Sequence, residues 1–415
     1  MRNKIEVTNS VVEIDGDEMT RIIWRMIKEK FIHPYLDVPI QYFDLSIENR
    51  DRTNDRVTTE AAKAIKACNV GIKCATITHT PARVKEFNSP AMLGSPNGRI
   101  RSILDGTIFR EPIIINNIPK AVPGWTEPII IGRHAFGDQY IAKDVKIPGA
   151  GEFKISFNSS ENADKNFEIL VNDFKGPGVG LGMFNTDESI YGFARSSMSL
   201  GLIKKWPVYF SAKDTILKQY DGRFREIFAE VYENEFRKDF EEAGIFYEYK
   251  LIDDMVSFVI KSSGRYIWAT KNYDGDVESD MTGAGFGSIG LMTSVLITPD
   301  GQTMESEAAH GTVTRHYRQH QAGKETSTNP IASIFAWTRG LAFRGKLDNN
   351  QELINFCHLL ENACIKTVEA GYMTKDLATC IYGTDVRHGE HYMYTDEFMN
   401  AIESTLVKSV QATLV

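Results

Sequence analysis

The sequence predicts an α/β fold, because segments with strand character alternate with amphipathic helices from the N-terminus onward. Residues 10–14 (SVVEI) are mostly apolar and β-branched, a turn follows at residues 15–20, and residues 21–31 (RIIWRMIKEKF) repeat apolar side chains at helical spacing. Residues 69–78 (NVGIKCATIT) predict another strand, whose C-terminal loop carries Lys73, Thr76 and Thr78. Ligands in such folds bind at the carboxyl ends of the strands.

Later segments extend the same pattern and add one insertion. The two EPIII segments, residues 111–115 and 127–131, are too short to cross a bilayer and predict buried strands. Residues 224–236 repeat large apolar side chains at helical spacing, in a pattern that stops at Gly244, and predict a helix packed on the core. Between residues 149 and 185, short alternating runs separated by Gly, Pro and Asn predict a small β insertion made of hairpins.

The composition narrows the classes of function. A chain of 415 residues is long enough for two or three domains. Acidic residues outnumber basic ones by 55 to 47, so nucleic acid is not an expected partner. The longest apolar runs are too short to cross a bilayer, so no membrane partner is expected either. The five cysteines show no CxxC spacing and predict reduced thiols. Without a recognisable presequence or peroxisomal signal, the cytosol is expected, or the mitochondrion if a presequence has been removed.

The most informative stretch is residues 271–290 (KNYDGDVESDMTGAGFGSIG), which places Asp276 and Asp280 one helical turn apart before a glycine-rich turn. Carboxylates at i and i+4 share one helix face, where they could hold a divalent cation. On these residues alone, a solvated acidic helix start is an equally open interpretation, since the helix dipole favours Asp in the first turn.

Three arginines lie in polar, turn-forming sequence and predict an anionic substrate. Arg101, Arg110 and Arg133 each adjoin a glycine or an apolar run, so each is expected where a strand opens into a loop. Guanidinium groups bind carboxylates through paired hydrogen bonds, and three together would suit a substrate with several carboxylates. Taken singly, each is compatible with an ordinary surface arginine.

Together these motifs resemble the homodimeric NADP-dependent isocitrate dehydrogenases, which belong to the metal-dependent decarboxylating dehydrogenases. KNYDGDVESD resembles the signature of the larger family, and IKCATIT, SPNG, GRHAFGDQY, KQYDGRF, LIDDMV and AAHGTVTRHYR resemble its dimeric NADP branch. The resemblance runs from about Val11 to about Phe398. It implies large and small α/β domains, with a β-rich clasp through which two subunits interlock. The implied boundaries are residues 1–104 and 287–415 for the large domain, 105–137 and 187–286 for the small domain, and 138–186 for the clasp.

The dinucleotide site is not expected to be a Rossmann pocket of the usual kind. The glycine clusters at residues 176–182 and 283–290 lack the strand before and the helix after that a GxGxxG fingerprint requires. A better candidate is HGTVTRH, residues 310–316, whose small residues allow phosphates to approach backbone N–H groups. Arg315 and His316 suit a 2′-phosphate, which favours NADP over NAD.

The resemblance implies NADP-dependent oxidative decarboxylation of isocitrate to 2-oxoglutarate and CO₂. The substrate would be bound by Thr78, Ser95, Asn97, Arg101, Arg110 and Arg133. Mg²⁺ or Mn²⁺ would be held by Asp276 and Asp280 with Asp253 of the other subunit. Lys213, again from the other subunit, would act as the base for the substrate hydroxyl, and Tyr140 would protonate the enolate carbon. The cofactor contacts implied are Lys73, Thr76, Thr78, Arg83, Asn97, Lys261 of the partner chain, Gly311, Thr312, Val313, Thr314, Arg315, His316 and Asn329.

Three positions depart from the family pattern, and two other functions stay open. Asp214 stands where the family usually has Asn, Asp105 where Gly is common, and Phe258 where Gln often contacts the cofactor. These changes put catalytic efficiency in doubt but remove no expected catalytic or metal residue. One alternative is a related NAD-dependent decarboxylating dehydrogenase acting on an alkylmalate or tartrate. The other is a non-catalytic subunit or metabolite-binding module that kept the fold.

Overall fold

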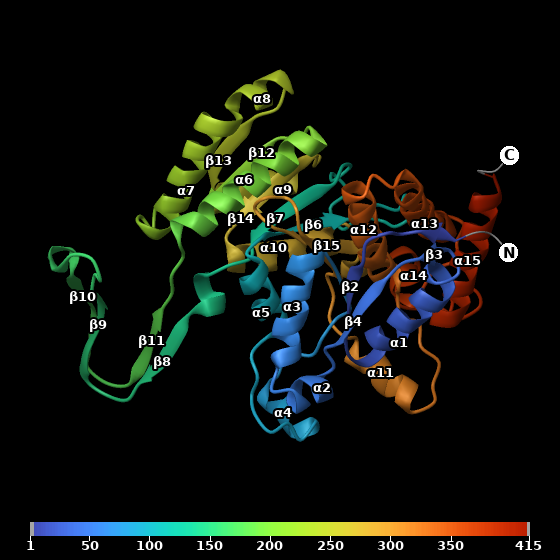
Figure 1. Cartoon of the computed structure of the whole chain (residues 1–415), viewed down its shortest axis with the longest axis horizontal. Coiled ribbons are helices and arrows are strands. Elements are labelled where there is room, and N and C mark those ends of the chain that lie inside the picture. The colour runs from blue at the N-terminus through green and yellow to red at the C-terminus, as the bar shows by residue number, and fades with distance from the viewer. Residues whose placement is uncertain (1–3, 413–415) are drawn as a thin grey trace.

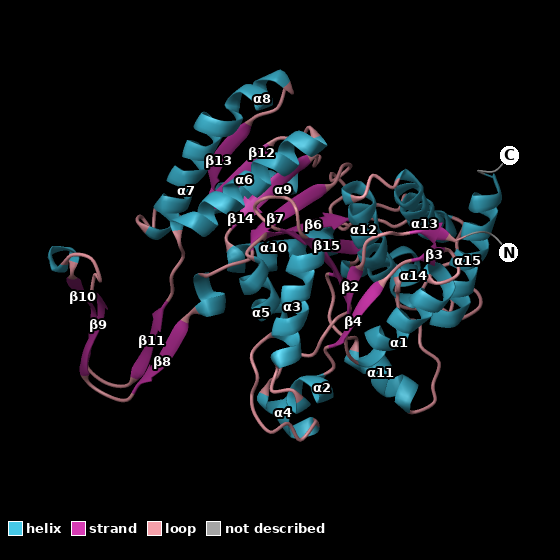
Figure 2. Cartoon of the chain, in the orientation of Figure 1, coloured by secondary structure: helices cyan, strands magenta, loops and turns pink. Residues whose placement is uncertain are grey.

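A ten-stranded mixed sheet runs through the molecule in the computed structural model, which describes residues 4–412 (Figures 1 and 2). This confirms the expected α/β class. In spatial order the strands are β13 (Tyr247–Leu251), β12 (Val208–Ala212), β14 (Tyr266–Thr270), β7 (Ile129–His134), β6 (Thr107–Pro112), β15 (Met292–Ile297), β16 (Met304–Ala308), β5 (Val70–Lys73), β2 (Val11–Asp15) and β4 (Ile40–Asp44). The short strands β1 (Ile5–Glu6) and β3 (Leu36–Asp37) pair separately.

The sheet consists of two parallel groups joined by antiparallel pairing at its centre. Strands β13, β12, β14 and β7 are mutually parallel, as are β16, β5, β2 and β4. Between them, β6 and β15 pair antiparallel with each other and with their outer neighbours. Because the pairing is in register, one row across the centre contains Arg110, Ser294, Glu307 and Lys73.

Helices cover the sheet and bury two large apolar cores. One core lies around the C-terminal helices and α1 (Glu18–Ile27). The other lies between α6 (Asp187–Lys204), α7 (Tyr220–Val231) and the strands beside β12. The helices are α1 (Glu18–Ile27), α2 (Ile47–Arg52), α3 (Arg56–Cys68), α4 (Pro81–Glu86), α5 (Pro96–Leu104), α6 (Asp187–Lys204), α7 (Tyr220–Val231), α8 (Arg237–Glu242), α9 (Ile252–Lys261), α10 (Asn272–Gly285), α11 (Thr314–Gln321), α12 (Ile331–Leu347), α13 (Gln351–Glu369), α14 (Lys375–Tyr382) and α15 (Thr395–Ala412). Every helix within residues 4–412 is too short or too polar to cross a membrane.

Most of the expected elements are confirmed, and two strands are shorter than expected. The strand predicted from residues 69–78 is β5, which ends at Lys73; Lys73 was expected in the loop but lies in the strand, because it pairs with Glu307 of β16. Residues 21–31 lie in α1 and the π-helical turn that continues it, and the helix expected at residues 224–236 is α7 with its own π-helical turn. The first EPIII segment was predicted as a strand to Ile115, but β6 ends at Pro112. Its neighbour β15 begins opposite Pro112, so residues 113–115 have no strand to pair with, although Ile113 and Ile115 are buried.

The predicted β insertion is confirmed as two antiparallel ribbons that project from the body of the molecule (Figure 1). Strands β8 (Lys143–Ile147) and β11 (Gly178–Gly182) form one ribbon, and β9 (Gly151–Phe157) and β10 (Phe167–Phe174) form the other. Glycines 178–182 therefore belong to a strand, and neither glycine cluster opens a helix after a strand. Isolated two-stranded ribbons cannot bury their own apolar side chains. Here these remain exposed: Val145, Ile155, Phe157, Phe167, Ile169, Leu170, Val171, Val179 and Leu181.

Candidate active site

Asp276 and Asp280 lie one turn apart on α10, as the spacing predicted, and face a cluster of arginines. Arg133 of β7 forms an ion pair with Asp276. Arg110 of β6 lies 3.7 Å from Asp276 and 3.4 Å from Asp280, measured between nitrogen and oxygen. Helix α10 approaches β7 this closely because residue 275 is glycine. A Cβ there would lie 2.7 Å from both the Cβ of Arg133 and the Oγ1 of Thr270.

The three arginines do not all occupy the loop positions expected for them. Arg133 is near the end of β7, but Arg110 is inside β6 and Arg101 is inside α5. That expectation was wrong for two of them. Ser95 caps a helix that begins at Pro96 and extends past Arg101. Arg110 pairs with Ser294 and Ile131 of the neighbouring strands, so β6 continues past it to Pro112. All three are buried, so none is an ordinary surface arginine.

Burial and mutual repulsion perturb the titration of this cluster. Burial, together with the nearby Arg101, lowers the pKa of Arg133 to about 10. Burial would raise the pKa of Asp276, but Arg133 and a hydrogen bond from Tyr140 hold it below its ordinary value. The pKa of Asp280 is raised by burial, with Asp276 adding to the effect and Arg110 opposing it. Two adjacent carboxylates beside three guanidinium groups suit a site that takes up both a cation and an anionic ligand.

Tyr140 belongs to the same cluster. Its hydroxyl donates to Asp276 over 2.8 Å, and the Arg133 guanidinium lies 4.6 Å from the centre of its ring. Burial and the neighbouring Asp276 outweigh the opposing effect of Arg133 and raise the pKa of Tyr140 to about 12. The phenol is therefore protonated at neutral pH. The side chain remains 46% exposed, so a ligand can reach it.

Glu307 links the arginine cluster to Lys73 and was not identified from the sequence. Its carboxylate accepts a hydrogen bond from Lys73 over 3.0 Å and from Arg101 over 2.8 Å. Burial would raise the pKa of Glu307, but these two cations hold it well below its usual range. On the same strand, Glu305 is buried, and one of its carboxylate oxygens has no hydrogen-bond partner within residues 4–412. Burial and the charge of Glu307 raise the pKa of Glu305 far above its ordinary value.

The remaining substrate candidates lie on the loop after β5 and at the start of α5. Thr76 donates to the side-chain oxygen of Asn97 over 3.3 Å, which joins the two segments. Ser95 caps α5 through the N–H of Gly98 and is exposed, as is Thr78. The buried carboxylate of Asp17, also missed by the sequence analysis, accepts from the N–H of Ile77 and so fixes this loop.

Lys213 and Asp253 lie apart from the other candidates within one chain. The Lys213 ammonium donates to Asp253 over 2.6 Å, and both side chains are exposed. Within residues 4–412 of a single chain, no three His, Cys, Asp or Glu side chains are placed to hold a metal ion. Asp253 therefore does not join Asp276 and Asp280 unless it comes from a second chain.

Each of the three residues that depart from the family pattern has a defined backbone conformation or a defined set of side-chain contacts in the structure. Asp105 has a φ of +50°, a conformation that explains why glycine is common there, and it accepts a hydrogen bond from Ser189. Asp214 is engaged by Arg225 and by the Tyr249 hydroxyl, 2.5 and 2.6 Å away. Phe258 packs against Tyr209 and Tyr266.

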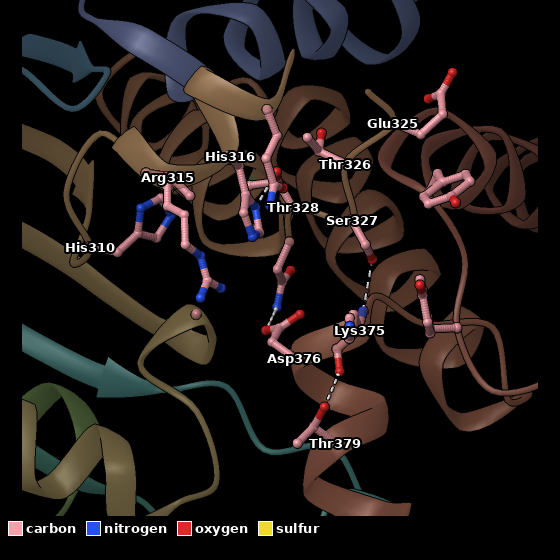
Figure 3. A pocket seen from close by; sticks show the side chains of 16 residues that line it. His310, Arg315, His316, Glu325, Thr326, Ser327, Thr328, Lys375, Asp376 and Thr379 are labelled. Carbon is pink, nitrogen blue, oxygen red and sulfur yellow. Dashed lines mark hydrogen bonds between the residues drawn. The ribbon is translucent and has the colours of Figure 1, made fainter. Parts of the chain in front are cut away.

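A pocket of about 760 Å³ lies where the HGTVTRH segment meets α14 and residues 325–329 (Figure 3). Arg315 is exposed, and its guanidinium extends into the pocket; Nδ1 of His316 lies 2.8 Å from the Thr328 hydroxyl. Asn329 donates to Asp376 over 3.1 Å. Of the predicted cofactor residues, the lining contains Val313, Arg315, His316 and Asn329. It also contains His310, the first residue of the predicted segment, to which no contact had been assigned, and residues that the sequence did not single out, including Gln319, Glu325, Lys375 and Asp376.

His310 offers an acceptor to a ligand in this pocket. Its Nδ1 lies 2.9 Å from the carbonyl oxygen of Gly311 and so carries the proton, while its Nε2 is buried without a partner among the described residues. Burial lowers the pKa of His310, so the ring is neutral and Nε2 can accept a hydrogen bond. The sequence could have indicated His310 as a cofactor contact, since it is the first residue of the predicted cofactor segment.

Other predicted cofactor residues lie outside the pocket lining. Arg83, Thr312 and Thr314 all donate to the carboxylate of Glu18, and Lys73 is buried against Glu307. Gly311 is exposed beside the pocket. Lys261 is exposed at the end of α9, on the same helix as Asp253, and the resemblance assigned it to the partner chain.

Comparison with known proteins agrees with this geometry. Residues 6–402 match the family model described as isocitrate/isopropylmalate dehydrogenase. The chain is 60% identical over 404 residues to an Arabidopsis thaliana protein named isocitrate dehydrogenase [NADP], chloroplastic/mitochondrial, covering 97% of this chain and 83% of that protein. It is 58% identical over 409 residues to the mitochondrial isocitrate dehydrogenase [NADP] of Sus scrofa, covering 98% and 97%. A Nicotiana tabacum isocitrate dehydrogenase [NADP] is 60% identical over 405 residues, covering 97% of each.

Proposed function

Because this chain belongs to the isocitrate/isopropylmalate dehydrogenase family, we propose that it is an NADP-dependent isocitrate dehydrogenase that yields 2-oxoglutarate and CO₂. The observation that carries the proposal is the convergence of three buried arginines on the Asp276 face of α10. A substrate with three carboxylates would be met by Arg101, Arg110 and Arg133, with Thr78, Ser95 and Asn97 adding hydrogen bonds.

Asp276 and Asp280 would hold a divalent cation together with Asp253 of a second copy. The donor set fits, because it consists of carboxylate oxygens, which suit Mg²⁺ or Mn²⁺. When bound, the cation supplies Lewis-acid polarisation of the substrate oxygen. Displacement of Arg110 and Arg133 from these carboxylates would free both guanidinium groups for the substrate.

Tyr140 and Lys213 would handle the protons. As the carbinol C–H leaves as a hydride, Lys213 of the second copy takes the proton of the substrate hydroxyl, and a ketone forms. Cleavage of the adjacent C–C bond then releases CO₂ and leaves an enolate. Tyr140, protonated at neutral pH, donates its proton to the enolate carbon, and Asp276 orients its hydroxyl.

NADP would lie along the pocket beside α11, where it supplies the acceptor for the hydride. Arg315 and His316 would contact the 2′-phosphate, with Lys261 of the second copy, and His310 would accept a hydrogen bond from a cofactor hydroxyl. The fit is supported by a positively charged side chain and an unpartnered acceptor on the wall of one pocket. Gly311, Thr312, Val313, Thr314 and Asn329 would form the adjoining wall, and Lys73, Thr76, Thr78, Arg83 and Asn97 the end nearer the substrate.

We also propose a homodimer with shared sites and the domain division that the resemblance implied. The division comprises a large domain (1–104 and 287–415), a small domain (105–137 and 187–286) and a clasp (138–186). The exposed apolar side chains of the β8–β11 ribbons support an interlocking role for the clasp. The pairing of Lys213 with Asp253, away from Tyr140 and Asp276, supports sites completed by a second copy.

One spectrophotometric assay tests the function. NADP and NAD are each offered with isocitrate and with isopropylmalate, with and without Mg²⁺. The proposal predicts reduction of NADP with isocitrate and Mg²⁺ only. Reduction of NAD with isopropylmalate would favour the related dehydrogenase instead, and no reduction in any combination would favour a non-catalytic subunit. The compartment stays a prediction, because the relatives include mitochondrial and chloroplast proteins.

A further inference from the structure

The carboxylate of Glu18 joins α1, α4 and the segment at the start of α11, and the last of these lines the proposed cofactor pocket. We propose that Glu18 is a positioning residue for the cofactor: it holds Arg83, Thr312 and Thr314 so that the first turn of α11 presents its backbone N–H groups to the phosphates. The proposal deepens the proposed function and rests on it. Glu18 would not touch the cofactor itself.

The contacts of Glu18 use both of its carboxylate oxygens. Oε1 accepts from Nη1 of Arg83 over 2.9 Å, and Oε2 accepts from Nη2 of the same guanidinium over 3.2 Å. Oε2 also accepts from the hydroxyls of Thr312 and Thr314, the latter over 2.6 Å. The Glu18 side chain is only 3% exposed. A charged group so deeply buried is tolerable only because every partner is a donor.

The backbone beneath Glu18 is fixed, so its carboxylate can act as an anchor. Glu18 has a φ of +53°, which is strained for a residue with a side chain. A side chain at Gly16 would bring its Cβ within 1.9 Å of the carbonyl oxygen of Ala75, so only glycine allows the turn to approach the loop after β5. Between them, Asp17 accepts from the N–H groups of Ile47 and Ile77, 2.9 and 2.8 Å away. The turn that carries Glu18 is thus tied to two neighbouring segments.

The target of this anchor is the start of α11. Val313 has a φ of +57°, and α11 begins at Thr314 without a capping side chain. The first N–H groups of a helix have no intrahelical acceptor and attract anions. Glu18 engages the hydroxyls of Thr312 and Thr314 and leaves these N–H groups unoccupied by any described residue. Arg315 and His316, in the same first turn, line the pocket.

The charges at this junction are balanced before any cofactor binds. Arg83 neutralises Glu18, and Glu86 lies 2.9 Å from both Arg83 and Arg318. Each threonine hydroxyl has one proton, and in both cases it is donated to Glu18. The two hydroxyls are therefore structural ties rather than phosphate donors, which distinguishes a positioning role for Glu18 from competition with the cofactor.

The experiment compares Glu18→Gln, Thr312→Val, their double mutant and two controls. Glutamine keeps the shape but turns an amide N–H₂ toward donors, and valine removes one buried hydroxyl. Thr312→Ser keeps that hydroxyl. Glu48→Gln removes a charge from an exposed residue that lines the same small surface pocket as Glu18. NADPH affinity is measured by fluorescence titration of the protein without substrate. Amide hydrogen exchange of residues 311–321 is measured without NADPH.

We expect Glu18→Gln and Thr312→Val each to weaken NADPH binding about tenfold, as loss of a charge-assisted hydrogen bond does. The double mutant should bind NADPH little more weakly than the weaker-binding single mutant, because both changes remove the same hydrogen bond between Glu18 and Thr312. Exchange at residues 311–321 should be faster in both, while Glu48→Gln should behave like wild type. Thr312→Ser, which keeps the hydroxyl, should change NADPH binding and exchange less than Thr312→Val does. The KM for isocitrate should change less than the KM for NADP.

Wild-type or tighter NADPH binding by Glu18→Gln, with unchanged exchange, would overturn the proposal, since tighter binding would mean that Glu18 competes with the cofactor. If Glu18→Gln does not fold, Thr312→Val against Thr312→Ser gives the same decision. Failure of wild type itself to bind NADPH would instead contradict the proposed function, and the exchange measurement would still test Glu18.

Discussion

At the scale of single residues, the environment rather than the residue type sets the chemistry of the site. Burial and Asp276 raise the pKa of Tyr140 further above neutrality, and Arg133 has a lowered pKa because it is buried beside Arg101. Glu307 stays ionised between two cations, whereas Glu305 on the same strand is driven toward its neutral form. Pairs of like groups whose pKa values are pushed apart are typical of functional sites.

Replacing Asp280 by Asn tests the metal assignment. The change removes one charged ligand while keeping the shape, so the Mg²⁺ concentration for half-maximal activity should rise by about tenfold or more, and turnover should fall. Activity is measured across a Mg²⁺ titration, with Asp239→Asn on the exposed face of α8 as the control. Wild-type rates in excess chelator would contradict the assignment.

Replacing Arg315 by Ala tests the choice of cofactor. The loss of a charge-assisted contact should weaken NADP binding by about 2 kcal/mol and leave NAD nearly unaffected, because only NADP carries the 2′-phosphate. Titration with both cofactors measures this. Lys324→Ala, which removes an exposed positive charge just beyond α11, should affect neither. Equal losses for NADP and NAD would place Arg315 away from the phosphate.

Glu305→Gln tests whether Glu305 is neutral in the folded protein. Because the folded-state pKa is raised above its ordinary value of 4.5, its stabilising contribution is complete below that value and is lost as pH rises through the folded pKa. The wild-type free energy of unfolding should therefore fall with pH by up to about 1.4 kcal/mol per unit more steeply than that of the variant. Urea denaturation between about pH 5 and pH 7 measures the slopes. Parallel slopes would show that Glu305 is ionised, and the exposed Glu241→Gln should leave the slope unchanged.

At the scale of elements, the site depends on how closely α10 and β7 pack. The glycine at position 275 permits this, and the register of β6, β15, β16 and β5 then places Arg110, Glu307 and Lys73 in one row. The substrate and cofactor candidates are connected through that row as well as through the loop after β5, which carries Thr76 and Thr78. A displacement of α10 should therefore affect substrate binding before it affects the cofactor pocket.

Gly275→Ala tests this packing. Its Cβ would meet Arg133 and Thr270 at 2.7 Å, so α10 must move, which should cost about 2 kcal/mol of stability and raise the KM for isocitrate. Gly222→Ala is the matched control, since it is also helical and buried but has no atom within 4 Å of the added Cβ. The control should be neutral or slightly stabilising, because alanine favours helix. Thermal unfolding and isocitrate kinetics are the measurements, and equal behaviour of the two variants would contradict the packing argument.

At the scale of the whole molecule, one chain contains every proposed group but does not bring them all together. Tyr140, Arg133 and Asp276 are in contact, while Lys213 pairs with Asp253 elsewhere on the same chain. The projecting ribbons expose apolar side chains that a second copy would cover. A twofold dimer would then contain two composite sites.

Coexpression of Tyr140→Phe and Lys213→Met tests the shared site. Each variant alone should be nearly inactive. In a heterodimer, one site receives both changes and the other neither, so random mixing should restore roughly a quarter of wild-type activity. The mixture is assayed after heterodimers have been demonstrated by differential tagging. Activity no higher than that of the separate variants would mean that both residues serve the same site from one chain.

The sequence was sufficient where a local pattern decides the structure. Local patterns predicted the spacing of Asp276 and Asp280, the strand and helix periods and the hairpins of the insertion, and the structure confirms them. The family was predicted from many motifs together, and the comparisons confirm it. It failed where the same residues fit more than one local structure. Arg101 was expected at a strand end and lies in a helix, because the cap at Ser95 outweighs the turn character of its neighbours.

The sequence by itself therefore determined the fold class, the family and most of the residues that carry the proposed chemistry. Only the tertiary structure decided which charges meet. Glu307 reaches Lys73 and Arg101 across 234 and 206 positions of sequence, and Glu18 reaches Thr312 across 294. No local period or motif encodes such contacts, because they arise when strands and loops distant in the chain are brought together and buried carboxylates must find donors.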